Sequence, residues 1–248
     1  MTLQFVEPST EAQPLKALLY GPPGSGKTCA ACSSPGPILY INCEGPDALT
    51  FSRKLHGDEK IHEVAFEGKQ TLVDTYVYLR AGEGGEQTVV VDSIGEMYRM
   101  LLEEVGGERA TLQNYGDVNT LIERFCRSLR DLPIHVVLVA HEEIADVEGE
   151  IVRRPVTGGK KLPEILMAMM SVVSYCGVVA EKDGSPRRWV GQLIQANGRR
   201  AKDRSDTLGK SRDLDLIEWI NTMRGEHTPE APEFERPDPK KSKEAVPA

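Results

Sequence analysis

The sequence predicts an α/β fold in which a mainly parallel, twisted sheet is covered by helices on both faces. Short apolar runs alternate with segments of helical spacing up to residue 141, as crossover connections between parallel strands require. A glycine-rich segment follows the first apolar run, where a strand passes into a helix. The length of 248 residues suits one large domain with short flanking segments.

The expected elements follow one another along the chain. Apolar runs predict strands at 15–20, 38–42, 88–93 and 134–141, and the alternating pattern of residues 61–66 predicts another. Helical spacing predicts helices at 26–33, 47–55, 71–80, 94–104 and 115–132. After residue 141 strands and helices no longer alternate regularly. We expect a small hairpin about Glu148–Gly149 and a short helix at 162–170. An antiparallel hairpin whose strands flank residues 183–186 and an amphipathic helix at 213–223 should follow.

The chain divides into three expected parts. Residues 1–14 are polar and are expected to form a flexible N-terminal segment, and residues 15–224 carry the domain. Residues 225–248 contain five prolines and only two sizeable apolar side chains, Phe234 and Val246. We therefore expect this C-terminal tail to be disordered.

Composition narrows the class of protein. No apolar run approaches the roughly 18 residues of a membrane span, and the N-terminus lacks the basic and apolar regions of a signal peptide. We therefore expect a cytoplasmic protein. Of the five cysteines, Cys29 and Cys32 form a CxxC pair at an expected helix, without a second pair or a histidine cluster nearby. A reduced, buried pair is favoured over a metal or redox site.

Charge is unevenly distributed. The net charge is −8, which argues against a uniformly basic nucleic-acid binder. Residues 151–204 nevertheless hold eleven lysines and arginines against four carboxylates, so this third is +7 and the rest is −15. This distribution favours a focused anionic partner, although a mixed solvated surface is the alternative.

The glycine-rich segment matches GxxxxGK[ST] in full. Its glycines let several backbone N–H groups point at one phosphate chain, and the helix that follows adds its dipole. Lys27 would reach the β and γ phosphates, and Thr28 would offer its hydroxyl to Mg²⁺. The sequence therefore predicts binding of ATP and Mg²⁺ by Gly21, Pro22, Pro23, Gly24, Ser25, Gly26, Lys27, Thr28 and Cys29.

Carboxylates after two other strands complete the expected site. Asp92 ends the run TVVVD and is expected to hold Mg²⁺ with Thr28, although capping of the next helix is the alternative. Many ATPases place a glutamate directly after this aspartate, but here the next residue is Ser93. The base that activates water must come from elsewhere, and Glu44, which follows the second strand, competes with Glu96. A simple turn role for Glu44 before Gly45 stays open.

The order of these signals resembles the RecA-type recombinase core. The segment ILYINCEGPDAL resembles the RecA strand whose glutamate is the catalytic base, and VVVDSIGEM resembles the Walker B strand of RecA. The segment VVLVAH resembles the RecA strand whose terminal residue senses the γ-phosphate. VTGGKKLPEIL resembles the end of the second DNA-binding loop. The short length, the histidine and AKDR resemble more closely the phage RecA-like ATPases of the Sak type, which are single-strand annealing proteins. Room is lacking for the N-terminal element and C-terminal domain of RecA.

The resemblance assigns roles to later residues. His141 would be the γ-phosphate sensor, with an ordinary loop histidine as the alternative. The following segment, 142–161, is expected to be flexible and to contact DNA phosphates through Arg153, Arg154, Lys160 and Lys161, with a solvated surface loop as the alternative. Lys202 and Arg204 would reach the ATP of a neighbouring subunit, although a DNA-facing or solvated cluster stays open.

Three functions are compatible with these features. The favoured one is an oligomeric, DNA-stimulated ATPase that binds single-stranded DNA and promotes annealing or strand exchange in phage recombination, with a single-stranded-DNA-binding protein as a further expected partner. The second is an ATPase switch that loads or remodels a protein without touching DNA. The third, a small-molecule kinase, would need an arginine-bearing lid that the sequence does not indicate.

Overall fold

The computed structural model describes residues 13–107, 109–179, 187–226 and 231. Its strands are β1 (Lys16–Gly21), β2 (Ile38–Asn42), β3 (Ile61–Ala65), β4 (Thr88–Asp92), β5 (His135–Val147), β6 (Glu150–Pro155), β7 (Val172–Val179), β8 (Arg188–Gln192), β9 (Lys202–Asp203) and β10 (Ser211–Asp213). Its helices are α1 (Lys27–Cys32), α2 (Thr50–His56), α3 (Lys69–Ala81), α4 (Ile94–Gly106), α5 (Leu112–Arg130), α6 (Leu162–Met169) and α7 (Leu216–Met223).

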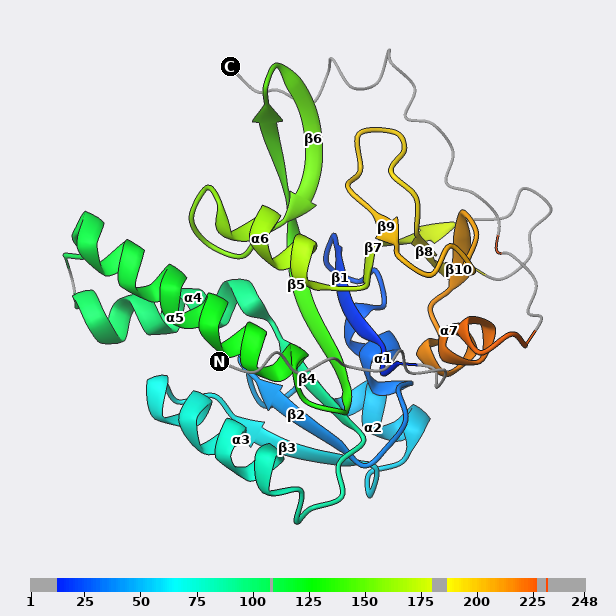
Figure 1. Ribbon diagram of the computed structural model, residues 1–248, viewed down its shortest axis with the longest axis horizontal. Coiled ribbons are helices and arrows are strands. Elements are labelled where there is room, and N and C mark those ends of the chain that lie inside the picture. Colours follow the sequence, from blue (N-terminus) through cyan, green and yellow to red (C-terminus); the bar gives the residue numbers. More distant parts are fainter. Residues whose placement is uncertain (1–12, 108, 180–186, 227–230, 232–248) are drawn as a thin grey trace, which may run out of the picture.

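The strands form one sheet with a parallel centre and an antiparallel edge. Its main path runs β10-β8-β7-β1-β5-β4-β2-β3, while β6 pairs with β5 and β9 with β7 (Figure 1). The pairs from β7 through β3 along this path are parallel, and the pairs that involve β6, β8, β9 or β10 are antiparallel. The predicted α/β fold class is therefore confirmed.

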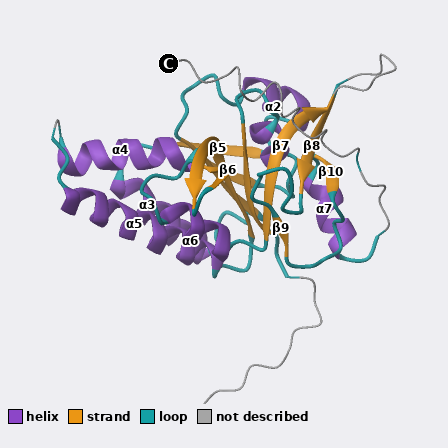
Figure 2. Ribbon diagram, turned by 90° about the horizontal axis from the view of Figure 1, so that it is seen from above, coloured by secondary structure: helices purple, strands orange, loops and turns teal. Residues whose placement is uncertain are grey.

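Two apolar cores lie on opposite faces of the sheet. Side chains alternate along each strand, so that Leu18 of β1 joins one core and Leu19 joins the other. The first core contains residues of α3, α4, α5 and α6, and the second contains residues of α1 and α7. Figure 2 shows α3 to α6 gathered together and α7 apart from them. These layers bury both faces of the central strands.

The central helices begin at residues that suit a helix start. Ser93 is the N-cap of α4 and its hydroxyl accepts a hydrogen bond from the amide of Glu96. Thr111 and Asn114 form a capping box at the start of α5. Such caps satisfy backbone N–H groups that the first helical turn leaves without partners. Ser93 also sits directly after β4, so this cap fixes where the chain leaves the sheet.

The parallel register brings the ends of β1, β2 and β4 to one edge of the sheet, beside the middle of β5. Asn42 of β2 pairs with Asp92 of β4, and Asp92 is also level with Val139 of β5. Gly21 of β1 pairs with His141. The segments that follow β1, β2 and β4 therefore start side by side at the carboxyl edge, where open parallel sheets hold their ligands.

The structure departs from several expected boundaries. β5 does not end at residue 141 but continues to Val147, because the chain runs straight into the hairpin with β6. The last helix starts at Leu216 rather than 213, because Ser211–Asp213 pairs with β8 and Asp215 caps the helix. The expected turn at 183–186 lies outside the described residues, although the hairpin of β7 and β8 that it joins is confirmed.

The two terminal segments fall largely outside the described part of the chain. Residues 1–12 and most of the expected tail after residue 225 are not described. Ala231 is an exception, because it is buried and exchanges two hydrogen bonds with Ser211, so the chain returns to the domain there. None of the helices in the described ranges is long and apolar enough to cross a bilayer.

Candidate active site

The phosphate loop lies between β1 and α1, as its sequence predicts. Gly21 allows close passage of β7, since a Cβ atom there would lie 2.2 Å from the carbonyl oxygen of Cys176. Gly26 has a φ of 82° and precedes α1, a conformation that favours glycine. The Lys27 ammonium donates to the carbonyl oxygens of Gly21 at 3.0 Å and Pro22 at 2.8 Å. This side chain thus curls across the loop, and its burial lowers the pKa of the amine.

Asp92 and Thr28 form the expected cation-binding pair. The Thr28 hydroxyl donates to Asp92 Oδ2 at 2.6 Å, and so does the Tyr40 hydroxyl at 2.6 Å. Asp92 is 2% exposed, and burial raises the pKa of its carboxyl despite these two donors. A buried carboxylate beside a threonine hydroxyl offers the hard oxygen ligands that Mg²⁺ prefers. These residues therefore fit a magnesium ion.

Glu44 is held in place by its own turn and by its neighbours. Asn42 Oδ1 accepts the amides of Glu44 at 2.9 Å and Gly45 at 3.2 Å, which fixes the turn after β2. The Ser93 hydroxyl donates a short hydrogen bond to Glu44 Oε1. His141 Nε2 lies 3.5 Å from the same oxygen. The carboxylate therefore lies between the ends of β4 and β5, beside the phosphate loop.

Glu96, the competing candidate base, is placed differently. Its carboxylate accepts hydrogen bonds from Arg99 at 3.1 Å and 2.5 Å, on the surface of α4. Only its backbone amide contacts Ser93. Of the two glutamates, Glu44 is the one whose carboxylate contacts both Ser93 and His141, so its geometry suits water activation better.

A large cavity opens beside the phosphate loop. Its volume is about 1120 Å³, and its lining joins the loop, Glu44, Asp92 and His141 to three more distant segments. α2 contributes Phe51 and Leu55, which are 64% and 58% exposed. Opposite them lie Trp189 of β8, which is 48% exposed, and Leu214. Large apolar side chains that face a polar phosphate loop are what a nucleotide base requires.

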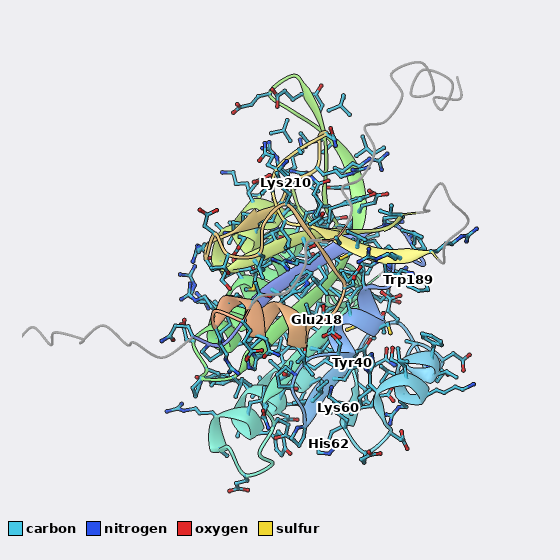
Figure 3. All side chains as sticks on the ribbon, turned by 90° about the vertical axis from the view of Figure 1, so that its right-hand side faces the viewer. Tyr40, Lys60, His62, Trp189, Lys210 and Glu218 are labelled. Atoms are coloured by element: carbon cyan, nitrogen blue, oxygen red, sulfur yellow. The ribbon has the colours of Figure 1, made fainter. Side chains whose placement is uncertain are left out.

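Trp189 is a cavity residue that the sequence analysis missed. Figure 3 labels Trp189 on β8. Its indole N–H donates to the Gly24 carbonyl oxygen at 3.4 Å, and its ring lies against Gly26. Nothing local in the sequence signals this contact, because the two residues are 165 positions apart. Phe51 and Leu55 carried a usable signal, since their spacing of four places two large apolar side chains on one face of a helix directly after Glu44.

The hairpin predicted about Glu148–Gly149 is confirmed, so the segment 142–161, expected to contact DNA, is not a flexible loop over most of its length. Residues 142–155 form a two-stranded hairpin of β5 and β6. Arg153 forms an ion pair with Glu142 at 2.9 Å, and Arg154 forms one with Glu143 at 2.8 Å. With five carboxylates and two arginines, the hairpin carries a net charge of −3. Its sequence held the signal, because a two-residue turn at Glu148–Gly149 places Glu143 opposite Arg154.

Lys160 and Lys161 differ from the two arginines. Both are exposed and follow the hairpin, at the start of α6. No ion pair joins either lysine to a carboxylate within the part of the chain that the structure describes. Of the four cations expected to contact DNA, these two are therefore the ones whose charge is not balanced by a carboxylate of the described residues.

Lys202 and Arg204 lie together at the other edge of the sheet. Their side chains both donate to the carbonyl oxygen of Ala168, from Lys202 at 3.3 Å and from Arg204 at 2.5 Å. β9 pairs with Val172 and Val173, at the amino end of β7, whereas the phosphate loop follows the carboxyl end of β1. Burial and the neighbouring Arg204 lower the pKa of Lys202 to about 8. This pair does not belong to the chain's own phosphate site.

The five cysteines are free thiols. Cys29 and Cys32 lie in α1, where burial raises the pKa of each thiol, that of Cys32 to about 12. Cys29 lines the nucleotide cavity and its sulfur lies 3.5 Å from His56 Nε2. Because a raised pKa keeps a thiol protonated, this pair is a packing element rather than a reactive one.

Comparisons with known proteins agree with this arrangement. A family model described as an AAA domain matches residues 13–205, which include the phosphate loop, Glu44, Asp92 and His141. A search of curated proteins gives no match. Because the matched region covers most of the chain and contains the phosphate loop and the residues around it, the chain belongs to the AAA domain family of P-loop ATPases.

Proposed function

We propose that this ATPase binds single-stranded DNA and promotes annealing or strand exchange in bacteriophage homologous recombination. The observation that carries the proposal is the contact of Glu44 with Ser93 and His141 beside the phosphate loop. A base supplied by the second strand, rather than by the residue after Asp92, is the feature that resembles RecA-type recombinases. The basic region 151–204 supports DNA as the partner.

Each residue of the site has a role in hydrolysis. The loop amides and Lys27 bind the phosphates, and Thr28 and Asp92 would hold Mg²⁺, which neutralises phosphate charge when bound. Glu44 orients the attacking water and accepts its proton. His141 donates to the γ-phosphate, and its contact with Glu44 links loss of that phosphate to the start of the hairpin. Phe51, Leu55, Trp189 and Leu214 enclose the base.

The remaining cations serve an assembly. Lys202 and Arg204 lie away from the chain's own phosphate loop, so they would act on the ATP of a neighbouring copy. Lys160 and Lys161 are exposed and would contact the DNA backbone. Arg153 and Arg154 would contribute after release from Glu142 and Glu143. The protein would therefore work as a homo-oligomer on a single strand.

ATP turnover with and without single-stranded DNA tests this function, together with the mass of the assembly under each condition. We expect DNA to stimulate turnover several-fold, and ATP with DNA to raise the mass above that of one chain. If single-stranded DNA does not change the rate of ATP turnover and the protein does not bind DNA at low salt, the recombination function is excluded. Replacing Lys160 and Lys161 by alanine should weaken DNA binding and leave ATP binding intact.

A second function is favoured by one observation. The projecting hairpin is acidic and its arginines are internally paired, which suits a basic protein surface better than a phosphate backbone. An ATPase switch that remodels a protein partner would have such a surface. It would show ATP-dependent binding of that partner and no effect of DNA on turnover.

A further inference from the structure

A groove lies between β6 and the loop that joins β8 to β9, two segments that run beside each other at the top of Figure 1. Its volume is about 440 Å³, and it is lined by residues 150–152 and 195–200. The Arg153 amide donates to the Gly198 carbonyl at 2.6 Å, and the Arg200 amide donates to the Arg153 carbonyl at 3.1 Å. These bonds hold the two walls together. The groove shares no lining residue with the nucleotide cavity.

Arg200 is the arginine of this groove that is best placed to bind an anion. One of its terminal nitrogens donates to the neutral side chain of Gln195 at 3.3 Å. Its Nε is buried and has no hydrogen-bond partner among the described residues, and none of their carboxylates forms an ion pair with it. Arg153 and Arg154, in contrast, are matched by Glu142 and Glu143. The terminal nitrogens of Arg200, which have an amide rather than a carboxylate as their partner among the described residues, are the donors that a phosphate or carboxylate ligand could engage.

The second arginine of the groove is held in a fixed position. The Arg199 guanidinium lies 4.6 Å from the centre of the Tyr175 ring, and it donates to Gln192 at 3.2 Å. This contact keeps a second positive charge at the groove in a fixed position. A side chain that is ordered in advance loses less entropy when it binds an anion.

The rest of the lining suits a polymer rather than a small ion. Gln195, Asn197 and Gly198 are exposed, so the groove is open along the surface. Ile151 is 66% exposed and lines it, and the adjacent Ile194 is 41% exposed. Apolar side chains beside a cation fit the sugar and base that flank each phosphate of a nucleic acid. No aromatic ring belongs to the lining, so bases are not expected to be selected by stacking.

We propose that this groove binds the phosphodiester backbone of single-stranded DNA, with Arg200 as its main contact and Arg199 beside it. The proposal rests on the proposed function and changes the place of contact, from the paired arginines of the hairpin to the loop opposite them. Glu150 lies at the same groove and is exposed. The negative charge of Glu150 repels a phosphate and so lowers the affinity of the groove for DNA. Removing this charge should therefore strengthen DNA binding.

Tyr20 connects the groove to the phosphate loop. Its hydroxyl lies 3.0 Å from the Arg153 carbonyl and 2.6 Å from the Arg200 carbonyl, one in each wall. Tyr20 is fully buried and directly precedes Gly21. Because a hydroxyl has one hydrogen for two carbonyl acceptors, a shift of β1 on nucleotide binding would change which wall it holds. Such a shift would let the groove respond to nucleotide.

Fluorescence anisotropy with a labelled oligothymidylate, in ATP analogue and Mg²⁺ over a range of salt, tests the groove. Arg200→Gln should weaken binding about three- to tenfold and lower the salt slope by about 0.7, the loss of one phosphate contact on a single strand. Glu150→Gln should strengthen binding. Arg127→Gln, which removes a surface arginine of α5 paired with Glu123, is the control and should change neither. Thermal unfolding checks that each variant folds.

The outcomes separate this proposal from the function on which it rests. If the unmodified protein binds no oligonucleotide at the lowest salt, the DNA-binding function itself fails. If it binds, but Arg200→Gln and Glu150→Gln both behave like the control, the DNA lies elsewhere and the groove is wrong. Binding of inorganic phosphate is measured as well, with chloride at equal ionic strength as its control. If Arg200→Gln abolishes binding of phosphate but leaves oligothymidylate binding unchanged, the groove is a small-anion site and the proposal is overturned.

Discussion

Replacing Glu44 by glutamine separates ATP binding from hydrolysis. Glutamine keeps the size of the side chain and an oxygen that accepts the Ser93 hydroxyl, but it cannot accept a proton from water. A positioned general base contributes 10²- to 10⁴-fold to a rate, which corresponds to about 3 to 5 kcal/mol of barrier. Glu44 is about one-third exposed, so its pairing with His141 contributes at most about 1 kcal/mol to stability. We therefore expect a folded protein with slow turnover.

The assay measures single-turnover hydrolysis, nucleotide affinity and thermal unfolding of Glu44→Gln. Turnover should fall at least 100-fold, while ATP affinity stays within about threefold because Lys27, Thr28 and Asp92 are untouched. Glu96→Gln is the matched control, since its carboxylate pairs with Arg99 on the surface of α4. Near-normal turnover of Glu44→Gln would refute the assignment, and a large loss in Glu96→Gln alone would transfer the role to that residue.

Three further predictions follow from the same geometry. ATP should change the fluorescence of half-exposed Trp189, and Trp189→Ala should abolish that change and weaken ATP binding several-fold; an unchanged titration would place the base elsewhere. Tyr20→Phe keeps the ring but removes both hydroxyl contacts, so amide exchange of residues 196–204 should become faster and insensitive to ATP, whereas unaltered exchange would contradict the coupling. Because burial lowers the pKa of Lys202 to about 8, its charge is present below pH 8 and lost above it. Turnover by the assembled protein should fall as the pH rises through 8, and Lys202→Arg should remove this fall if the charge acts on ATP.

The fold could be predicted because its signals are local. Each central strand is an apolar run, and the phosphate loop combines its strand, glycines and helix within a few residues. The relation of Glu44 to Asp92 needed one further assumption, that β2 and β4 are neighbours, and the observed register pairs Asn42 with Asp92. These features depend on short-range pattern and on simple strand order.

The rest of the site depends on contacts between distant segments. The cavity is closed by Phe51 and Trp189, which no short pattern relates. The basic region was predicted from a sum of charges, and a sum does not reveal which charges are already paired. Within it, Arg154 forms an ion pair with Glu143 across the hairpin, whereas the partner of the Arg200 guanidinium among the described residues is the neutral Gln195 side chain. Pairing within the fold, rather than charge in the sequence, decides which cations a ligand can use.

Ser93 explains why the candidate base lies on another strand. Its hydroxyl accepts from the Glu96 amide to begin α4 and donates to Glu44, so both of its hydrogen-bonding functions are used. A glutamate at position 93 would remove both the hydroxyl that caps α4 and the hydrogen bond that this hydroxyl donates to Glu44. Glu44 is therefore tied to the end of β4 through Ser93 and to β5 through His141. We propose that a γ-phosphate bound by His141 would compete with the second of these contacts. It would free the carboxylate for water while ATP is bound and would let the contact form again after phosphate leaves.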